Sequence, residues 1–208
     1  AVTILDSGVN SGHALIRPVL SGDDQHAVRA EWGVQDDPHY GHGTLMAGTI
    51  IYGDLAEALA TTDNYRILHC IESVKILPPW PAQNPKQLWG YLTAQGLSRA
   101  EIQAPHRKRI VCMALTSTED MDRGRPSSWS AEIDAVTSGA DDSRKRLFII
   151  SAGNVTDSND YRRYPDSNLS SSVHNPGQSW NALTVGAFTS KIQIQDTMLQ
   201  NYRPVADK

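Results

Sequence analysis

The chain has 208 residues, and its balance of 39% hydrophobic and 20% charged residues fits one globular domain rather than a disordered or fibrous chain. A formal net charge of −4 disfavours broad, charge-driven binding, so no nucleic-acid partner is expected. No stretch of about eighteen apolar residues is present, so no membrane-spanning segment is expected.

Apolar runs rich in β-branched residues alternate along the chain with segments of helical periodicity. In chain order we expect a strand over Ala1–Leu5, a helix over Thr44–Ala60, strands over Ile67–Ile71 and Ser73–Leu77, a helix over Pro85–Ile102, a strand over Arg109–Leu115, a helix over Ser127–Ser138, and strands over Leu147–Ser151 and Ala182–Phe188. Several strands are apolar on both faces, which is typical of a parallel sheet covered by helices. The pattern predicts a doubly wound α/β fold, with a mostly parallel sheet and helices on both faces.

Two polar stretches are expected to be loops. The segment Asp157–Gln178 is rich in Ser, Asn, Asp and Pro and predicts a surface loop. The acidic stretch Asp23–Asp37 lacks the ligand pattern of a calcium-binding loop and is expected to be solvated. We therefore expect no cofactor and no metal, while calcium at the acidic stretch stays open.

Both ends of the chain indicate a part of a larger protein. Residue 1 opens directly into a predicted core strand, without the basic and apolar regions of a signal peptide. The final residues, NYRPVADK, are polar and form no closing element. We expect a domain that is incomplete at its C-terminal end.

Three polar segments lie beside predicted strands or helices. Asp6 lies at the carboxyl end of the first predicted strand, and Asn154 lies just past the end of another. His42 lies at the start of a predicted helix, within Gly41-His42-Gly43-Thr44. Sites of open α/β sheets form outside the carboxyl ends of the strands, so we expect these side chains to converge.

The three residue types have complementary chemistry. The carboxylate of Asp6 can accept a hydrogen bond from one ring nitrogen of His42, which fixes the tautomer and stabilises the imidazolium. An imidazole with a pKa near 6.5 suits general-base catalysis near neutral pH. The side-chain amide of Asn154 can donate a hydrogen bond to an oxyanion. These three roles do not include a nucleophile.

The same segments resemble the motifs of the subtilisin-like serine protease family, the subtilases. Asp6-Ser7-Gly8 is similar to the family's D-[ST]-G motif. The residues HGTLMAG, which begin at His42, are similar to the family's H-G-T-x-x-A-G motif, and the residues SAGN, which begin at Ser151, are similar to its A-G-N motif. The interval of 36 positions from Asp6 to His42 is typical of the family. Two further strands resemble the family's V-K-V-L and N-x-[IL]-x-V-G-A patterns: Ser73–Leu77 and Asn181–Ala187.

The resemblance implies a three-layer α/β/α peptidase domain with an Asp-His-Ser triad. Asp6 would orient His42, His42 would act as general base, and Asn154 would stabilise the oxyanion. The family's nucleophile lies in G-T-S-x-[AS], and no such motif occurs before Lys208. We therefore expect residues 1–208 to be a partial peptidase domain, inactive alone, whose serine lies in the missing C-terminal segment of its parent chain.

The resemblance also implies where a peptide or protein substrate would bind. One wall is the segment Ala114, Leu115 and Thr116, and the other is Ser151, Ala152 and Gly153. Thr116 replaces a glycine of the family pattern N-M-S-L-G, which predicts altered side-chain pockets beside the substrate.

Other interpretations of these residues remain open. The principal alternative is a catalytically dead, subtilisin-fold binding or regulatory module, and a weaker one is a nucleotide-binding α/β domain. The glycines of Gly41–Gly48 match neither phosphate-loop spacing. An aspartic protease would need two D-[ST]-G aspartates in an all-β fold. His39 and His42, with Asp36 and Asp37 nearby, lack the spacing of an H-E-x-x-H metal site.

Residues outside these motifs are interpreted as structural or surface residues. They include the histidines His13, His26, His69, His106 and His174. Two cysteines, Cys70 and Cys112, are expected to be free thiols in core strands. They do not require an oxidising compartment, which slightly favours the cytoplasm over secretion.

Overall fold

The computed structural model describes residues 1–60, 62, 64–117, 124–188, 193–195 and 197–204. Its centre is a six-stranded sheet in the order β2-β3-β1-β4-β5-β6. The strands are β1 (Val2–Asp6), β2 (Gln25–Ala27), β3 (Ile71–Lys75), β4 (Ile110–Met113), β5 (Leu147–Ser151) and β6 (Leu183–Val185). Each pairing between these described strands is parallel. The carboxyl ends of all six strands therefore lie at one edge.

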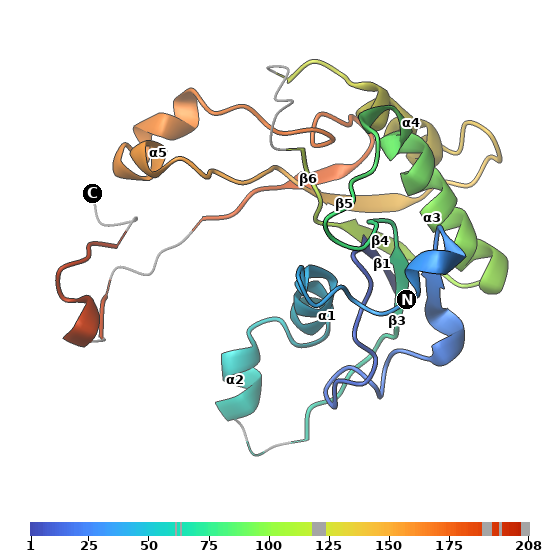
Figure 1. Ribbon diagram of the computed structural model, residues 1–208, viewed down its shortest axis with the longest axis horizontal. Coiled ribbons are helices and arrows are strands. Elements are labelled where there is room, and N and C mark those ends of the chain that lie inside the picture. Colours follow the sequence, from blue (N-terminus) through green and yellow to red (C-terminus); the bar gives the residue numbers. More distant parts are fainter. Residues whose placement is uncertain (61, 63, 118–123, 189–192, 196, 205–208) are drawn as a thin grey trace.

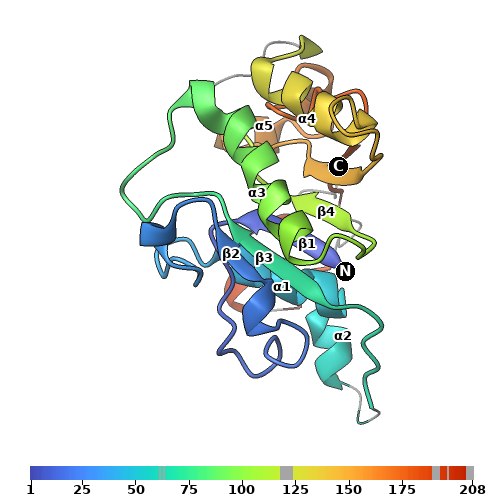
Figure 2. The ribbon, with the colours of Figure 1, turned by 90° about the vertical axis from the view of Figure 1, so that its right-hand side faces the viewer.

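Helices cover both faces of the sheet. The described helices are α1 (His42–Tyr52), α2 (Leu55–Ala60), α3 (Trp89–Gln103), α4 (Ser128–Ser138) and α5 (Ser158–Arg162). Helices α3 and α4 lie on one side of the sheet and α1 lies on the other (Figure 1). Figure 2 shows α3 in front of the strands. The expected three-layer α/β/α fold is confirmed.

The alternation of side chains along β1 divides the core into two layers. Leu5 is fully buried in a cluster with residues of α3 and α4, whereas Ile4 is buried in a second cluster with residues of α1. Successive strand residues point to opposite faces, so neighbours of one strand serve different layers. Asp6, the last residue of this doubly buried strand, is thereby fixed at the sheet edge.

Several expected elements have different bounds in the structure. The helix expected over Thr44–Ala60 divides near Gly53, which has φ 64° and ends α1. The strand expected over Ile67–Ile71 is wrong, because residues 64–70 have no regular structure and β3 begins at Ile71. Strand β2 was not expected, because its three residues, QHA, carry no apolar pattern.

The acidic stretch Asp23–Asp37 is not wholly solvated, which corrects the expectation. Asp24 is buried and accepts a hydrogen bond of 2.6 Å from Arg107. The same guanidinium and that of Arg109 also bind the buried carboxylate of Glu72. These charges compensate one another at the amino end of β3, away from the edge that carries Asp6.

The described helices include none that could cross a membrane, judged by their length and apolar content.

Candidate active site

Asp6 and His42 form a hydrogen-bonded pair at the carboxyl edge of the sheet. The Nδ1 atom of His42 lies 2.9 Å from Oδ2 and 3.0 Å from Oδ1 of Asp6. A carboxylate only accepts hydrogen bonds, so Nδ1 carries a proton, and in the neutral ring Nε2 keeps its lone pair. Asp6 is 1% exposed, whereas the side chain of His42 is 43% exposed. The pair therefore joins a buried carboxylate to an imidazole that solvent can reach.

A second carboxylate, that of Asp36, forms hydrogen bonds both to the residue after β1 and to the start of α1, the two elements that carry Asp6 and His42. Its Oδ1 accepts the hydroxyl of Ser7 at 2.6 Å, and its Oδ2 accepts the backbone N–H of Thr44 at 2.8 Å. The hydroxyl of Ser7 in turn accepts the N–H of Gly43 at 3.2 Å. Gly41, the N-cap residue of α1, has no side chain that could accept a hydrogen bond from the first backbone N–H groups of the helix. Asp36, in the preceding loop, accepts one of these hydrogen bonds instead.

Helix α1 approaches the end of β1 so closely that Gly43 cannot carry a side chain. A Cβ atom on Gly43 would lie 2.0 Å from the backbone oxygen of Gly8 and 3.3 Å from Cβ of Asp6. The absence of a side chain here lets the helix start reach the turn after Asp6. The glycine of the H-G-T motif thus sets the distance between His42 and Asp6.

We expect Gly43→Ala to destabilise the intact protein by about 3 kcal/mol or more, in the upper range for overpacking, because the methyl would meet main-chain atoms. Gly48→Ala in the same helix is the matched control, since a Cβ there meets no atom within 4 Å. The control is expected to gain up to about 1 kcal/mol from the helix propensity of alanine. Urea unfolding measures both variants, and equal stabilities would contradict the close approach.

The environment of His42 favours its protonated form. The hydrogen bond to Asp6 raises the pKa of His42 above 6.5, partial burial opposes this, and the charges of Asp6 and Asp36 add to the increase. The folded protein therefore binds a proton at His42 more tightly than the unfolded chain does. The resulting stability is fully present below about pH 6.5 and is lost as the pH rises through the folded pKa.

We expect the free energy of unfolding of the native protein, relative to a His42→Gln variant, to decrease as the pH rises above about 6.5. Urea unfolding of the intact protein at several pH values measures this difference. Taking the difference removes the contribution of His26, whose pKa burial lowers. An Asp6→Asn background is expected to weaken the pH dependence, and an unchanged dependence there would contradict Asp6 as its cause.

Asn154 lies at the same sheet edge as the pair, beyond β5. Strand β4 lies between β1, which carries Asp6, and β5, which ends at Ser151. The Asn154 side chain is exposed, and no hydrogen bond joins it to Asp6 or His42. The segment Ala114–Thr116 follows β4, the strand that pairs with β1 on one side and with β5 on the other. The structure therefore joins the Asp6–His42 pair directly and places the other candidate residues along the same edge.

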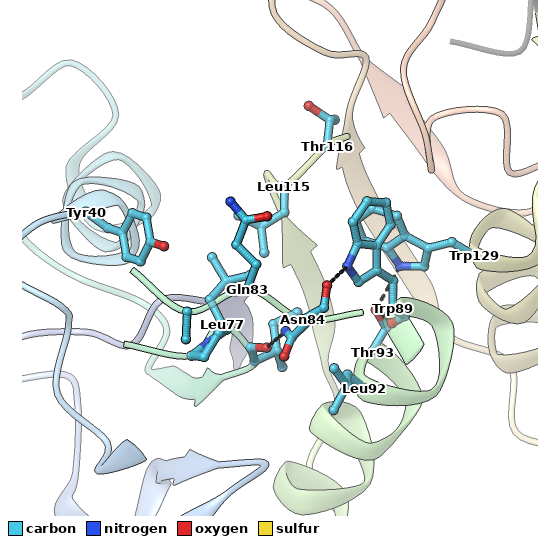
Figure 3. Close-up of a pocket in the computed structure, with 13 residues that line it drawn as sticks. Tyr40, Leu77, Gln83, Asn84, Trp89, Leu92, Thr93, Leu115, Thr116 and Trp129 are labelled. Atoms are coloured by element: carbon cyan, nitrogen blue, oxygen red, sulfur yellow. Dashed lines mark hydrogen bonds between the residues drawn. The ribbon is translucent and has the colours of Figure 1, made fainter. Parts of the chain in front are cut away.

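A pocket of about 210 Å³ lies beside the segment after β4 (Figure 3). Leu115 and Thr116 contribute to its lining, together with Tyr40, Trp89 and Trp129. The two tryptophan rings have centroids 5.0 Å apart. Their indole N–H groups are bound to the backbone oxygen of Asn84 and the hydroxyl of Thr93. This fixed aromatic wall can hold a large apolar group.

Comparison with models of known protein families shows to which family the chain belongs. The family model of the subtilases, peptidase family S8, matches residues 1–206. The chain belongs to the subtilase family. Subtilases are serine peptidases, so the expected hydrolase family is confirmed.

Comparison with individual proteins adds little beyond this. A search of curated proteins found no match. The solved structure of the epidermin leader peptide processing serine protease EpiP from Staphylococcus aureus is similar, with 15% identity and a TM-score of 0.48. The match covers 88% of this chain and 45% of that chain, so this subtilase sequence spans about half the length of that structure.

The structure of this subtilase also shows residues that the motifs did not indicate. The sequence indicates Asp36 only as part of a candidate metal site, and nothing in it marks this residue as a cap for α1. Tyr40, Trp89 and Trp129 come from three separate segments, so only the folded chain brings them together. The sequence gives two weak indications of this pocket: Tyr40 lies close to His42 in the chain, and Trp129 lies in a predicted amphipathic helix.

The interpretation of His39, His42, Asp36 and Asp37 as a metal site finds no support in the described part of this subtilase. No group of three or more His, Cys, Asp or Glu residues suited to a metal occurs there. The carboxylate of Asp37 accepts the backbone N–H groups of His39 and Trp80 instead.

Proposed function

We propose that the intact protein is a serine endopeptidase in which residues 1–208 form part of the peptidase domain. The observation that carries the proposal is the hydrogen bond from His42 to the buried Asp6, in a chain that belongs to the subtilase family. Such a pair suits proton transfer from a serine hydroxyl. The nucleophilic serine lies outside residues 1–208.

The chemical roles follow from the geometry of the pair. The serine oxygen attacks a peptide carbonyl, and Nε2 of His42 takes the serine proton. Asp6 stabilises the imidazolium that forms, and His42 then gives the proton to the leaving amine. The carboxamide of Asn154 donates to the oxygen that becomes negative in the tetrahedral intermediate.

The substrate class is a peptide or protein chain bound in an extended conformation. Its backbone lies between Ala114–Thr116 and Ser151–Gly153, where it adds to the edge of the site as a strand does. The aromatic pocket beside Leu115 and Thr116 receives one apolar substrate side chain. Thr116 narrows the approach to that pocket relative to the glycine of the family pattern.

The test is labelling of the intact protein with a fluorophosphonate probe, which reacts with an activated serine. We expect labelling of the native protein, and its loss in His42→Ala that retains the native circular dichroism spectrum. Equal labelling of both proteins would place the activated serine in another site. Absence of labelling in a folded native protein would favour the binding-module alternative.

A further inference from the structure

The segment Val173–Ser179, here called the buried strap, is hydrogen-bonded to the chain that follows β4 and to the chain that follows β5. Its sequence, VHNPGQS, is polar, and it lies in the stretch expected to be a surface loop. That expectation is wrong for residues 174–178, which are buried, and the following Ser179 is buried as well. The strap therefore occupies the interior of the molecule next to the residues that follow β4 and β5.

His174 joins the strap to both of these segments. Its backbone N–H donates to the oxygen of Ala152 at 2.9 Å. Its Nδ1 lies 2.9 Å from the backbone oxygen of Ser117, so Nδ1 carries the proton and donates. The N–H of Ser117 returns a hydrogen bond of 2.8 Å to the oxygen of Asn175. One residue thus connects the chain after β4 to the chain after β5.

The imidazole of His174 also fills the space beside Gly153. Gly153 has φ +116°, a conformation that favours glycine, and a Cβ built on it would lie 2.5 Å from Cγ of His174. The ring therefore packs directly against the backbone of the residue that precedes Asn154. A change in the ring alters the support of the main chain from which the Asn154 side chain extends.

The strap contains more buried polar side chains than packing of the interior alone would require. Asn175 Oδ1 and Gln178 Oε1 are buried and find no hydrogen-bond partner among the described residues. Unpaired buried polar atoms lower stability, and apolar residues would fill the same space without that loss. His174, by contrast, uses its Nδ1 and its backbone N–H in defined hydrogen bonds.

We propose that His174 is a positioning residue for the oxyanion side of the site. Its imidazole, held by the carbonyl of Ser117, fixes the backbone through Ala152 and Gly153 and thereby the carboxamide of Asn154. The inference rests on the proposed peptidase function and adds a residue to it. Donors to an oxyanion act within a narrow range of distance, so loss of this support reduces transition-state stabilisation.

The expected kinetic result is a loss in kcat rather than in KM. In the intact protein, His174→Leu is expected to lower kcat by about 10–100-fold, which is part of the effect of an oxyanion donor. His174→Asn places an amide N–H where Nδ1 lies and is expected to recover much of this loss. The matched control is Ser179→Ala, which removes the bond from the strap to Asp134 but leaves Gly153 untouched. Its kcat is expected to stay within about threefold of the native value.

A double-mutant cycle with Asn154→Ala separates positioning from general damage. If His174 acts through Asn154, His174→Leu lowers kcat by less than about threefold when Asn154 is already alanine. An equal loss in both backgrounds would overturn the proposal, as would an equal loss in Ser179→Ala. Where His174→Leu does not fold, the cycle is run with His174→Asn and a smaller expected loss.

A second measurement does not depend on turnover. The side-chain amide resonance of Asn154 is expected to shift in His174→Leu and to stay unchanged in Ser179→Ala. An unshifted resonance would contradict the positioning role even in an active enzyme. A shifted resonance in a protein without peptidase activity would refute the proposed function and leave the structural link between His174 and Asn154 intact.

Discussion

His42→Ala in the intact protein is expected to lower kcat by about 10⁶-fold, the loss measured for the equivalent change in subtilisin. The expectation follows from the pair, because the imidazole of His42 is hydrogen-bonded to a carboxylate that is 1% exposed. In the proposed mechanism, removal of the imidazole leaves no group at this position to take the serine proton. Hydrolysis of a fluorogenic peptide by the native and variant proteins measures the loss.

The neighbouring His39 provides the matched control for this change. Its ring stacks on Trp80 at a centroid distance of 4.2 Å and is not part of the pair with Asp6. His39→Ala is therefore expected to keep kcat within about tenfold of the native value. If both histidine variants lost activity equally, the loss would reflect damage to the loop before α1 rather than removal of a base.

Asn154→Ala is expected to lower kcat by about 10²–10³-fold with little change in KM, again the effect measured for the oxyanion asparagine of subtilisin. In the proposed mechanism the amide contributes mainly when negative charge develops on the substrate oxygen, so substrate binding is expected to be largely preserved. Asn154→Asp is expected to lose at least as much, because a carboxylate repels the oxyanion. Steady-state kinetics of the two variants measures these effects.

The exposed asparagine of α5, Asn159, is the matched control for Asn154. Asn159→Ala is expected to leave kcat and KM unchanged. A rise in KM without a fall in kcat for Asn154→Ala would assign this residue to substrate binding and not to the oxyanion.

The main features of the fold and the Asp6–His42 pair could be predicted from the sequence. Apolar strands separated by helices specify a parallel sheet, and such a sheet brings the ends of its strands to one edge. Asp6 is the last residue of a strand that is buried on both faces, so its place at this edge is fixed. The H-G-T motif carries His42 and Gly43 together, and both are needed for the contact with Asp6.

Other features could not be predicted because they depend on contacts between distant segments. The strap around His174 has a polar sequence, and its burial depends on hydrogen bonds to distant segments, among them those to Ser117 and Ala152. The aromatic pocket combines Trp89 of α3 with Trp129 of α4, which no local pattern relates. Strand β2 is short and polar, and its pairing with β3 defines it more than its own residues do.

The close contact between Gly43 and Gly8 has a consequence for directed evolution of this protein. A Cβ on Gly8 would lie 2.6 Å from the backbone oxygen of Gln35. Gly8 is therefore packed closely on two sides, against Gln35 and against Gly43. Substitution at either position displaces the same turn, so random libraries that vary one of them would consist largely of misfolded clones. Diversity is better directed to Tyr40 and Thr116, whose side chains line the pocket without bracing the helix start.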